Sequence, residues 1–255
     1  MSEPVLFDAR EDGIAVITLN RPETRNALSA EVRQGLFSAW DRFERDPDLR
    51  IAILTGAGDK AFCAGGDLKE TVEKGMPMPP RDMFPVPGDT IELSKPTIAA
   101  VNGFAFAGGW MIAQACDLCV ASTAARFALT EVKVGRSSPW AAPLIHMIPQ
   151  RIMMELLLTG KPIDAPRAYE IGLVNRLAEP GEVMNVALAL AAEILEGAPL
   201  SVRAARETVR LSTEMGRSAA LQAARHASEI CYHSEDAQEG PRAFAEKRPP
   251  RWQGR

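Results

Sequence analysis

The stretch from Lys95 to Gly135 constrains the fold of this chain more than any other part of it. It opens with a short apolar run, Thr97–Val101, which favours a buried strand, and a glycine-bearing turn follows. Ala107-Gly108-Gly109 then begins a second apolar run, which is long enough for about two helical turns. A strand, a glycine turn and a helix start, in that order, leave backbone N–H groups pointing at whatever lies in front of the helix.

A single carboxylate follows this glycine turn along the chain. Phe127–Val134 is predicted to form another strand, and it carries Glu131 among apolar neighbours. Backbone N–H donors and one carboxylate are the minimum that a protein needs to form an enolate and to protonate it again. Because the neighbours of Glu131 are apolar, we expect a raised pKa for its carboxyl group, which suits proton transfer near neutrality.

A second glycine turn, Ala64-Gly65-Gly66, has similar surroundings. It follows the apolar Ala61-Phe62-Cys63 and precedes Asp67, which is placed to cap or begin a helix. If the two preceding strands are neighbours, the N–H groups of both turns can converge on one oxygen atom, and glycine permits the close approach. Spacing alone leaves open the alternative of two ordinary tight turns, and neither turn matches a phosphate-binding loop.

Charge and hydropathy argue against several classes of function. The net charge of −4 at neutral pH is not that of a nucleic-acid-binding protein driven by bulk charge. No apolar stretch approaches the roughly 20 residues of a membrane span, and the N-terminal residues lack the basic and apolar segments of a signal peptide. We therefore expect a cytoplasmic protein that binds neither nucleic acid nor membrane.

The four cysteines do not form a recognisable metal site. Cys116 and Cys119 make a lone C-x-x-C, but zinc would need two further ligands, and the sequence has no second pair and no H-x₃-H. We expect two small buried thiols at a junction between a helix and a strand, and no bound metal.

The order of apolar segments predicts an α/β core followed by a helical C-terminal region. A hairpin is expected around Asp12-Gly13, then a helix capped by Ser29, then a strand buried on both faces at Ile51–Thr55. Strand and helix patterns alternate to about residue 190, and only helical patterns follow. Further helices are expected at 143–158 (interrupted at Pro149), 164–169, 183–195, 201–211 and 219–232, with a strand at 173–177. The proline-rich, apolar loop 72–89 is either a lid or pocket wall or a surface insertion.

Several motifs, in one fixed order, resemble those of a known family. They are Leu19–Leu28 (LNRPETRNAL), Ala61–Lys69 (AFCAGGDLK), Lys95–Gly109, Glu131, Leu158-Thr159-Gly160 with Gly172-Leu173-Val174, and Phe244–Arg248 (FAEKR). Together they are similar to the crotonase (enoyl-CoA hydratase/isomerase) superfamily, over almost the whole chain. The tail from His233 to Arg255 is particularly similar to that of the carnitinyl-CoA dehydratases.

The resemblance implies a crotonase-like spiral core of ββα turns with a helical C-terminal region, assembled as a homotrimer or as a hexamer (a dimer of trimers). Residues 1–195 would form the acyl-CoA-binding core, and residues 196–255 a region for trimerisation and for covering CoA. The backbone N–H groups of Gly66 and Gly108 would bind the thioester carbonyl. The family's CoA-binding positions fall on Arg25, Ala27, Ala64, Gly66, Asp67, Leu68, Lys69, Gly108, Phe244 and Lys247.

One departure from the family pattern affects the chemistry. Hydratases of the family use two glutamates, and the resemblance places the first at Met111 and the second at Glu131. A methionine can neither deprotonate water nor supply a proton, so Glu131 is the single acid–base candidate. The segment after it carries the bulky Arg136 and Trp140, which should reshape the acyl pocket. We expect Trp110, Met111 and Trp140 to line that pocket.

The resemblance therefore implies an enzyme of the enoyl-CoA hydratase/isomerase type that acts on an acyl-CoA through an enolate held in an oxyanion hole. Double-bond isomerisation and single-base hydration or dehydration both fit one glutamate, and no cofactor is expected beyond the CoA of the substrate. The alternative is an acyl-CoA-binding homologue with little or no hydratase activity. His146 is expected to be a core or interface imidazole, whereas Tyr232 and His233 lie at a helix end that approaches the acyl pocket in some relatives.

Overall fold

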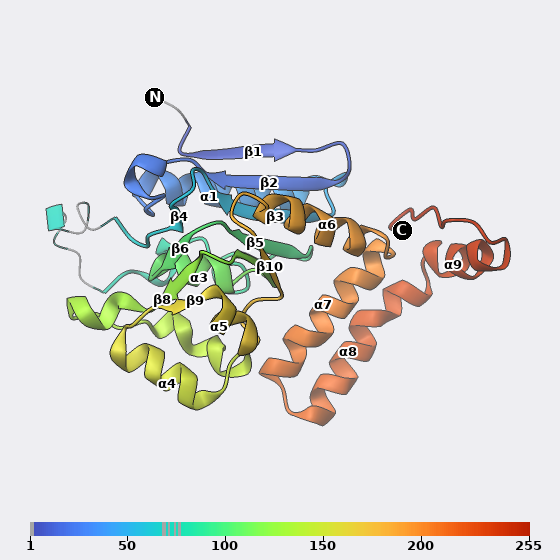
Figure 1. The fold of residues 1–255 in the computed structure, drawn as a ribbon. Helices are drawn as coiled ribbons and strands as arrows, with labels where there is room; N and C mark the ends of the chain where they lie inside the picture. The colour runs from blue at the N-terminus through green and yellow to red at the C-terminus, as the bar shows by residue number, and fades with distance from the viewer. Residues whose placement is uncertain (1–2, 68–69, 71, 74, 76–77) are drawn as a thin grey trace.

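The computed structural model describes residues 3–67, 70, 72–73, 75 and 78–255, and it has the predicted α/β architecture (Figure 1). The larger sheet has the strand order β1-β2-β3-β5-β7-β10. The first two strands form the predicted antiparallel hairpin, and the remaining neighbours are parallel. Its strands are β1 (Val5–Ala9), β2 (Ile14–Leu19), β3 (Ile51–Gly56), β5 (Thr97–Val101), β7 (Leu118–Ser122) and β10 (Arg176–Ala178).

A second, smaller sheet has the order β4-β6-β8-β9. Its first three strands are parallel, and the last is antiparallel to its neighbour. Strands of the two sheets alternate along the chain, because β3 leads to β4, β5 to β6, and β7 to β8. The chain thus winds between the sheets as the predicted spiral of ββα turns. The strands are β4 (Ala61–Cys63), β6 (Phe104–Phe106), β8 (Arg126–Ala128) and β9 (Ile163–Asp164).

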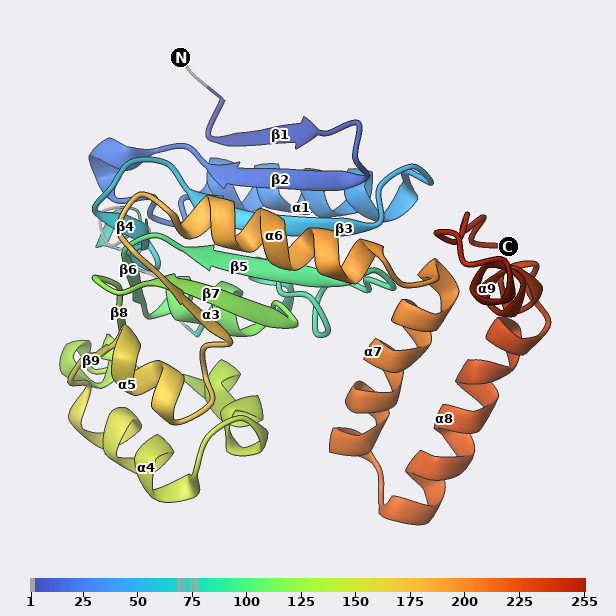
Figure 2. The same ribbon diagram turned by 45° about the vertical axis from the view of Figure 1, so that its right-hand side comes forward.

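Helices cover both faces of the larger sheet, which explains the uninterrupted apolar run of β3. Helix α1 (Ala30–Arg45) begins at Ser29, whose hydroxyl accepts from the Val32 N–H as predicted, and it buries Leu36, Trp40 and Phe43 on one side. Helix α6 (Val183–Leu195) packs on the other face, where Ala187 and Leu190 join a cluster with isoleucines of β2, β3 and β5. Figure 2 displays α6 in front of β3 and β5, with α1 behind.

The remaining helices lie at the two ends of the sheets. Helix α3 (Gly108–Gln114) follows β6, and α4 (Gln150–Thr159) and α5 (Ala165–Glu170) lie beside β8 and β9 (Figure 2). Short 3₁₀ helices are η1 (Pro22–Thr24), η2 (Arg81–Met83), η3 (Thr130–Val134) and η4 (Pro139–His146). Pro149 separates η4 from α4, which confirms the predicted interruption.

The C-terminal region is helical, as predicted, and extends away from the sheets (Figures 1 and 2). Helices α7 (Pro199–Glu214) and α8 (Arg217–Tyr232) form an antiparallel pair, and α9 (Asp236–Ala245) follows. Arg206 fixes α7 to the core through Asp117 at 2.7 Å and the Leu93 carbonyl at 2.6 Å. Among the described residues no single helix is long and apolar enough to span a membrane, although α6 and α7, bent by 107° at their junction, reach that length together.

Two predicted strands end at other residues than expected. Strand β8 stops at Ala128, and η3 replaces the rest of the predicted Phe127–Val134, because its partner β6 ends at Phe106 and leaves later residues no strand to pair with. The predicted strand 173–177 instead forms at Arg176–Ala178, where it pairs with β7. In the predicted loop 72–89, Val72 and Glu73 are helical and η2 forms a single 3₁₀ turn, and part of the segment lies outside the described residues.

Candidate active site

Three neighbouring strand ends bring the predicted site together. Strands β4, β6 and β8 are parallel neighbours, so their carboxyl ends meet at one edge of the smaller sheet. The turn at Ala64–Gly66 follows β4, the turn at 107–109 follows β6, and Glu131 follows β8. The Ala107 N–H donates to the Ala128 carbonyl at 2.8 Å, which ties the second turn to the strand before Glu131.

The two turns approach so closely that side chains would not fit at two glycines. A Cβ on Gly65, whose φ is +98°, would lie 2.9 Å from the Ala107 Cβ. A Cβ on Gly109 would lie only 2.1 Å from the Cys63 carbonyl oxygen. The strands before the two turns are neighbours, as the sequence prediction required. Glycine permits the close contact between the two turns, because it has no side chain.

Gly66 and Gly108 lie side by side at this contact. A Cβ built on Gly108 would lie 3.6 Å from the Gly66 nitrogen, and one built on Gly66 would meet no atom within 4 Å. Neither backbone N–H donates to an acceptor within the described part of the chain. Two adjacent donors beside an open space can together bind one oxygen atom on which negative charge develops.

The segment before α1 forms one wall of this edge. Arg25 and Asn26 have positive φ values of 55° and 56°, and the fully buried Asn26 side chain donates to the Ala57 and Ala61 carbonyls. The Leu28 N–H donates to the Gly65 carbonyl at 2.8 Å, and the Ala64 N–H to the Arg25 carbonyl at 3.0 Å. Arg25 and Ala27 are thus held next to the first glycine turn.

Three further CoA-binding candidates follow that turn. Asp67 lies 3.7 Å from the Arg21 guanidinium. Leu68 and Lys69 lie outside the described residues. Their predicted role in binding CoA therefore stays a prediction.

Glu131 is partly buried on η3. Its Oε1 accepts from the Trp140 Nε1–H at 3.1 Å, whereas Oε2 is buried and has no hydrogen-bond partner among the described residues. Burial raises the pKa of Glu131 above its usual value, and the nearby polar groups of its own backbone, Ser138 and Trp140 oppose that rise. A carboxyl group in this setting can hold or release a proton nearer to neutrality than an exposed one.

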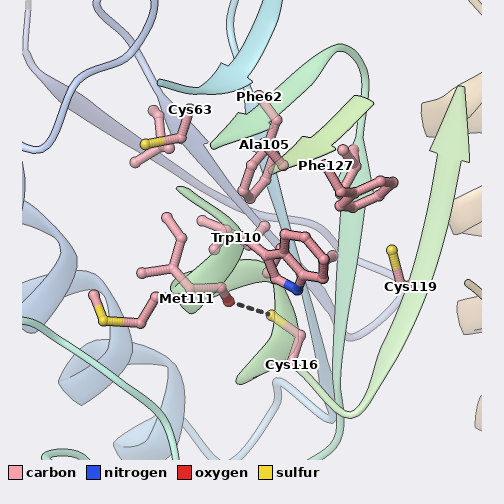
Figure 3. Packing of buried hydrophobic residues seen from close by; sticks show 14 of the residues in the cluster. Phe62, Cys63, Ala105, Trp110, Met111, Cys116, Cys119 and Phe127 are labelled. Atoms are coloured by element: carbon pink, nitrogen blue, oxygen red, sulfur yellow. Dashed lines mark hydrogen bonds between the residues drawn. The ribbon is translucent and has the colours of Figure 1, made fainter. Parts of the chain in front are cut away.

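Trp110 and Met111 both belong to the hydrophobic core (Figure 3). Trp110 exposes no surface and packs edge-on against Phe127, with ring centroids 5.7 Å apart. Met111 is 4% exposed. The structure therefore gives Trp110 a packing role, and the prediction that these two side chains line an acyl pocket stays a prediction.

The C-x-x-C is confirmed as a pair of buried free thiols, with Cys116 in the connection after α3 and Cys119 in β7. Burial raises the pKa of Cys119 to about 12, so neither a thiolate nucleophile nor a thiolate ligand is favoured there. Within the described residues, no group of three or more His, Cys, Asp or Glu side chains is placed to hold a metal ion.

Several candidates do not join this site in a single chain. Phe244, on α9, is 86% exposed, and Lys247 lies just beyond the end of that helix. Helix α9 lies on the opposite side of the molecule from β4, β6 and β8 in both views (Figures 1 and 2). Tyr232 and His233, at the end of α8, are exposed as well. His146 is exposed, so the expectation of a core imidazole is wrong, and the expectation of an interface imidazole stays a prediction.

Two glycine turns and one partly buried carboxylate at a shared strand edge are an arrangement that can polarise a carbonyl group and move a proton beside it. The family model described as enoyl-CoA hydratase/isomerase matches residues 9–255. The chain belongs to this family, as the sequence resemblance implied, and family members of this kind are enzymes that act on CoA thioesters.

Relatives and solved structures agree over the full length. The chain is 41% identical to a carnitinyl-CoA dehydratase of Citrobacter koseri, with all of both proteins covered. It is 39% identical to an (E)-benzylidenesuccinyl-CoA hydratase of Thauera aromatica, over 94% of this chain and 96% of that one. An enoyl-CoA hydratase structure from Mycobacterium tuberculosis superposes with a TM-score of 0.92 at 40% identity, with both chains fully covered. The crotonase-like fold is thereby confirmed.

Proposed function

We propose that this protein converts an acyl-CoA thioester through an enolate, with the Gly66 and Gly108 N–H groups binding the thioester oxygen and Glu131 as the single acid–base group. The observation that carries the proposal is the meeting of both glycine turns and Glu131 at the ends of three adjacent parallel strands. Polarising the carbonyl makes the α-proton acidic, and the half-buried carboxylate next to it can take that proton.

The single-base reading depends on Met111 as much as on Glu131. The resemblance places Met111 at the position of the first family glutamate, and its side chain is almost fully buried. Because methionine is neither an acid nor a base, this chain does not have the second group of the two-glutamate hydration mechanism. Double-bond isomerisation remains, as does hydration or dehydration with one base. The relatives whose names are hydratase or dehydratase make water addition or removal the first reaction to assay.

The proposal includes CoA binding along Arg25, Ala27 and Ala64–Lys69, with no separate cofactor. Phe244 and Lys247 could reach CoA only in another copy of the chain, since α9 lies far from the glycine turns. Exposed apolar side chains on the C-terminal helices, among them Val209, Leu221 and Ile230, suit burial in such a homotrimer or hexamer. A cytoplasmic location without nucleic-acid or membrane partners belongs to the same proposal.

Steady-state assays with crotonyl-CoA and with a 3-enoyl-CoA test the reaction directly. We expect the wild type to convert one of these two substrates, and we expect Glu131→Gln to convert that substrate about 10²- to 10⁴-fold more slowly. Crotonyl-CoA hydration at the rate of a two-glutamate hydratase would refute the reasoning from Met111.

The second candidate is a binding protein that retains the CoA site without efficient chemistry. The replacement of a glutamate by Met111 and the bulky Arg136 and Trp140 favour it. Solvent-deuterium exchange at the acyl α-carbon separates the two, because a protein that only binds acyl-CoA gives no exchange above the uncatalysed rate.

A further inference from the structure

The indole of Trp140 is a direct side-chain partner of the candidate acid–base group. Its Nε1–H donates to Glu131 Oε1 at 3.1 Å, across nine residues of chain. Extending the proposed function, on which this inference rests, we propose that Trp140 is a positioning residue: it holds Oε1 so that Oε2 alone carries the proton to and from the substrate.

The backbone of Trp140 is itself fixed to the helix that starts the second glycine turn. The Gln114 side-chain Nε2–H donates to the Trp140 carbonyl at 2.8 Å. Gln114 ends α3, and Gly108 begins it. One short helix therefore carries a candidate oxyanion donor at its first residue and the anchor of the indole at its last. This shared support holds the carboxylate and the N–H donors in a constant geometry.

The two oxygens of Glu131 are inequivalent as a result. Oε1 is engaged by the indole, and Oε2 is buried with no hydrogen-bond partner among the described residues. An unpartnered buried carboxylate oxygen is costly unless something else binds there. A substrate hydrogen is a partner of the right kind. The charged or titratable groups on the neighbouring η3, η4, α4 and connecting loop are Lys133, Arg136, His146, Arg151 and Glu155, all exposed.

The indole bond also affects the proton step. As Oε2 takes the α-proton, the C–H bond breaks, an O–H bond forms, and the electron pair moves into the enolate; the reverse transfer returns the proton to carbon. Trp140 takes no part in these bonds. Its N–H stabilises the carboxylate form of Glu131 and fixes the direction in which Oε2 points. Loss of the N–H should slow proton transfer without removing substrate binding.

An NMR titration tests the bond without any substrate. The chain has four tryptophans, so protein labelled with ¹⁵N at the indole nitrogens should give four Nε1–H signals, and Trp140→Phe identifies the one that disappears. We expect the Trp140 signal to shift with pH as Glu131 ionises and to lose that shift in Glu131→Gln. A Trp140 signal that does not respond to Glu131→Gln overturns the proposal, whatever reaction the enzyme catalyses.

Kinetics of Trp140→Phe test the positioning role. This variant keeps an aromatic ring and loses the donor, so kcat should fall about 10- to 100-fold, the usual effect of one hydrogen bond to a charged group. KM should change less than about twofold, and the acid limb of the pH profile should move to higher pH. A rise in KM alone would assign Trp140 to acyl binding, and unchanged kinetics would remove its role; either result refutes the proposal.

Trp252→Phe is the matched control. Trp252 also donates its Nε1–H to an oxygen, the Glu196 carbonyl, at 2.7 Å, but in the C-terminal tail. Its loss should leave the acid limb of the pH profile unmoved. A shift of the same size in this control would show that the effect does not come from Glu131 and would count against the proposal.

Discussion

Replacing Gly66 by alanine should separate activity from stability in this protein. The backbone of Gly66 is outside the left-handed region, and its new Cβ would meet no atom within 4 Å. The variant should therefore fold, with a free energy of unfolding equal to that of the wild type or up to about 1 kcal/mol higher. The added methyl group, however, occupies the open space beside the N–H groups of Gly66 and Gly108.

The expected loss is that of an oxyanion donor, about 3–4 kcal/mol or 10²- to 10³-fold in kcat/KM. Two other glycines make controls. Gly109→Ala should lower the free energy of unfolding by more than about 4 kcal/mol, because its Cβ would lie 2.1 Å from the Cys63 carbonyl oxygen. Gly216→Ala, at the start of α8, also meets open space and should leave activity unchanged. Chemical denaturation and steady-state kinetics measure both effects, and a fully active Gly66→Ala would refute the assignment of this donor.

Four further perturbations follow from particular contacts. Glu131→Gln should gain stability relative to the wild type as pH rises through the pKa of an unfolded glutamate and then through the raised pKa of folded Glu131, because the folded state favours the neutral carboxyl and this stabilising effect is lost when the group ionises; urea unfolding at several pH values measures this. Met111→Glu should raise crotonyl-CoA hydration at least about tenfold, which Met111→Gln should not do, and should cost stability because the site is buried. Ala107→Gly should raise the thermal midpoint by relieving a φ of 50°, a gain of about 1 kcal/mol. Arg206→Met should loosen α7 from Asp117 and lower the unfolding free energy by about 1–3 kcal/mol.

Local signals explain which parts of the fold could be predicted. The Ser29 cap and the spacing of Leu36, Trp40 and Phe43 determine α1 whatever surrounds it. The apolar run of β3 reflects cover on both faces, which α1 and α6 provide. The prediction of where β8 ends was wrong, because the end of β8 depends on where its partner β6 stops. No residue of Phe127–Val134 indicates where β6 stops.

The sequence predicts the site only on the condition that the strands before the two glycine turns are neighbours. The sequence placed a glycine turn after each of two strands, but whether those strands are neighbours is decided by the tertiary fold. The bond from Trp140 to Glu131 depends on the path of the intervening loop, including the left-handed Gly135, and no periodicity signals it. Trp110 and Met111 are adjacent on α3, and adjacent side chains of a helix point in different directions. In this fold both directions lead into the hydrophobic core.

The central claim is that Glu131 is the single proton carrier at an enolate held by the two glycine N–H groups. Deuterium incorporation at the α-carbon of a bound acyl-CoA in D₂O tests this claim most directly. The wild type should incorporate deuterium, and Glu131→Gln should do so about 10²- to 10⁴-fold more slowly while still binding the thioester. Equal incorporation by the two proteins, or none by the wild type with any acyl-CoA that it binds, would contradict the account.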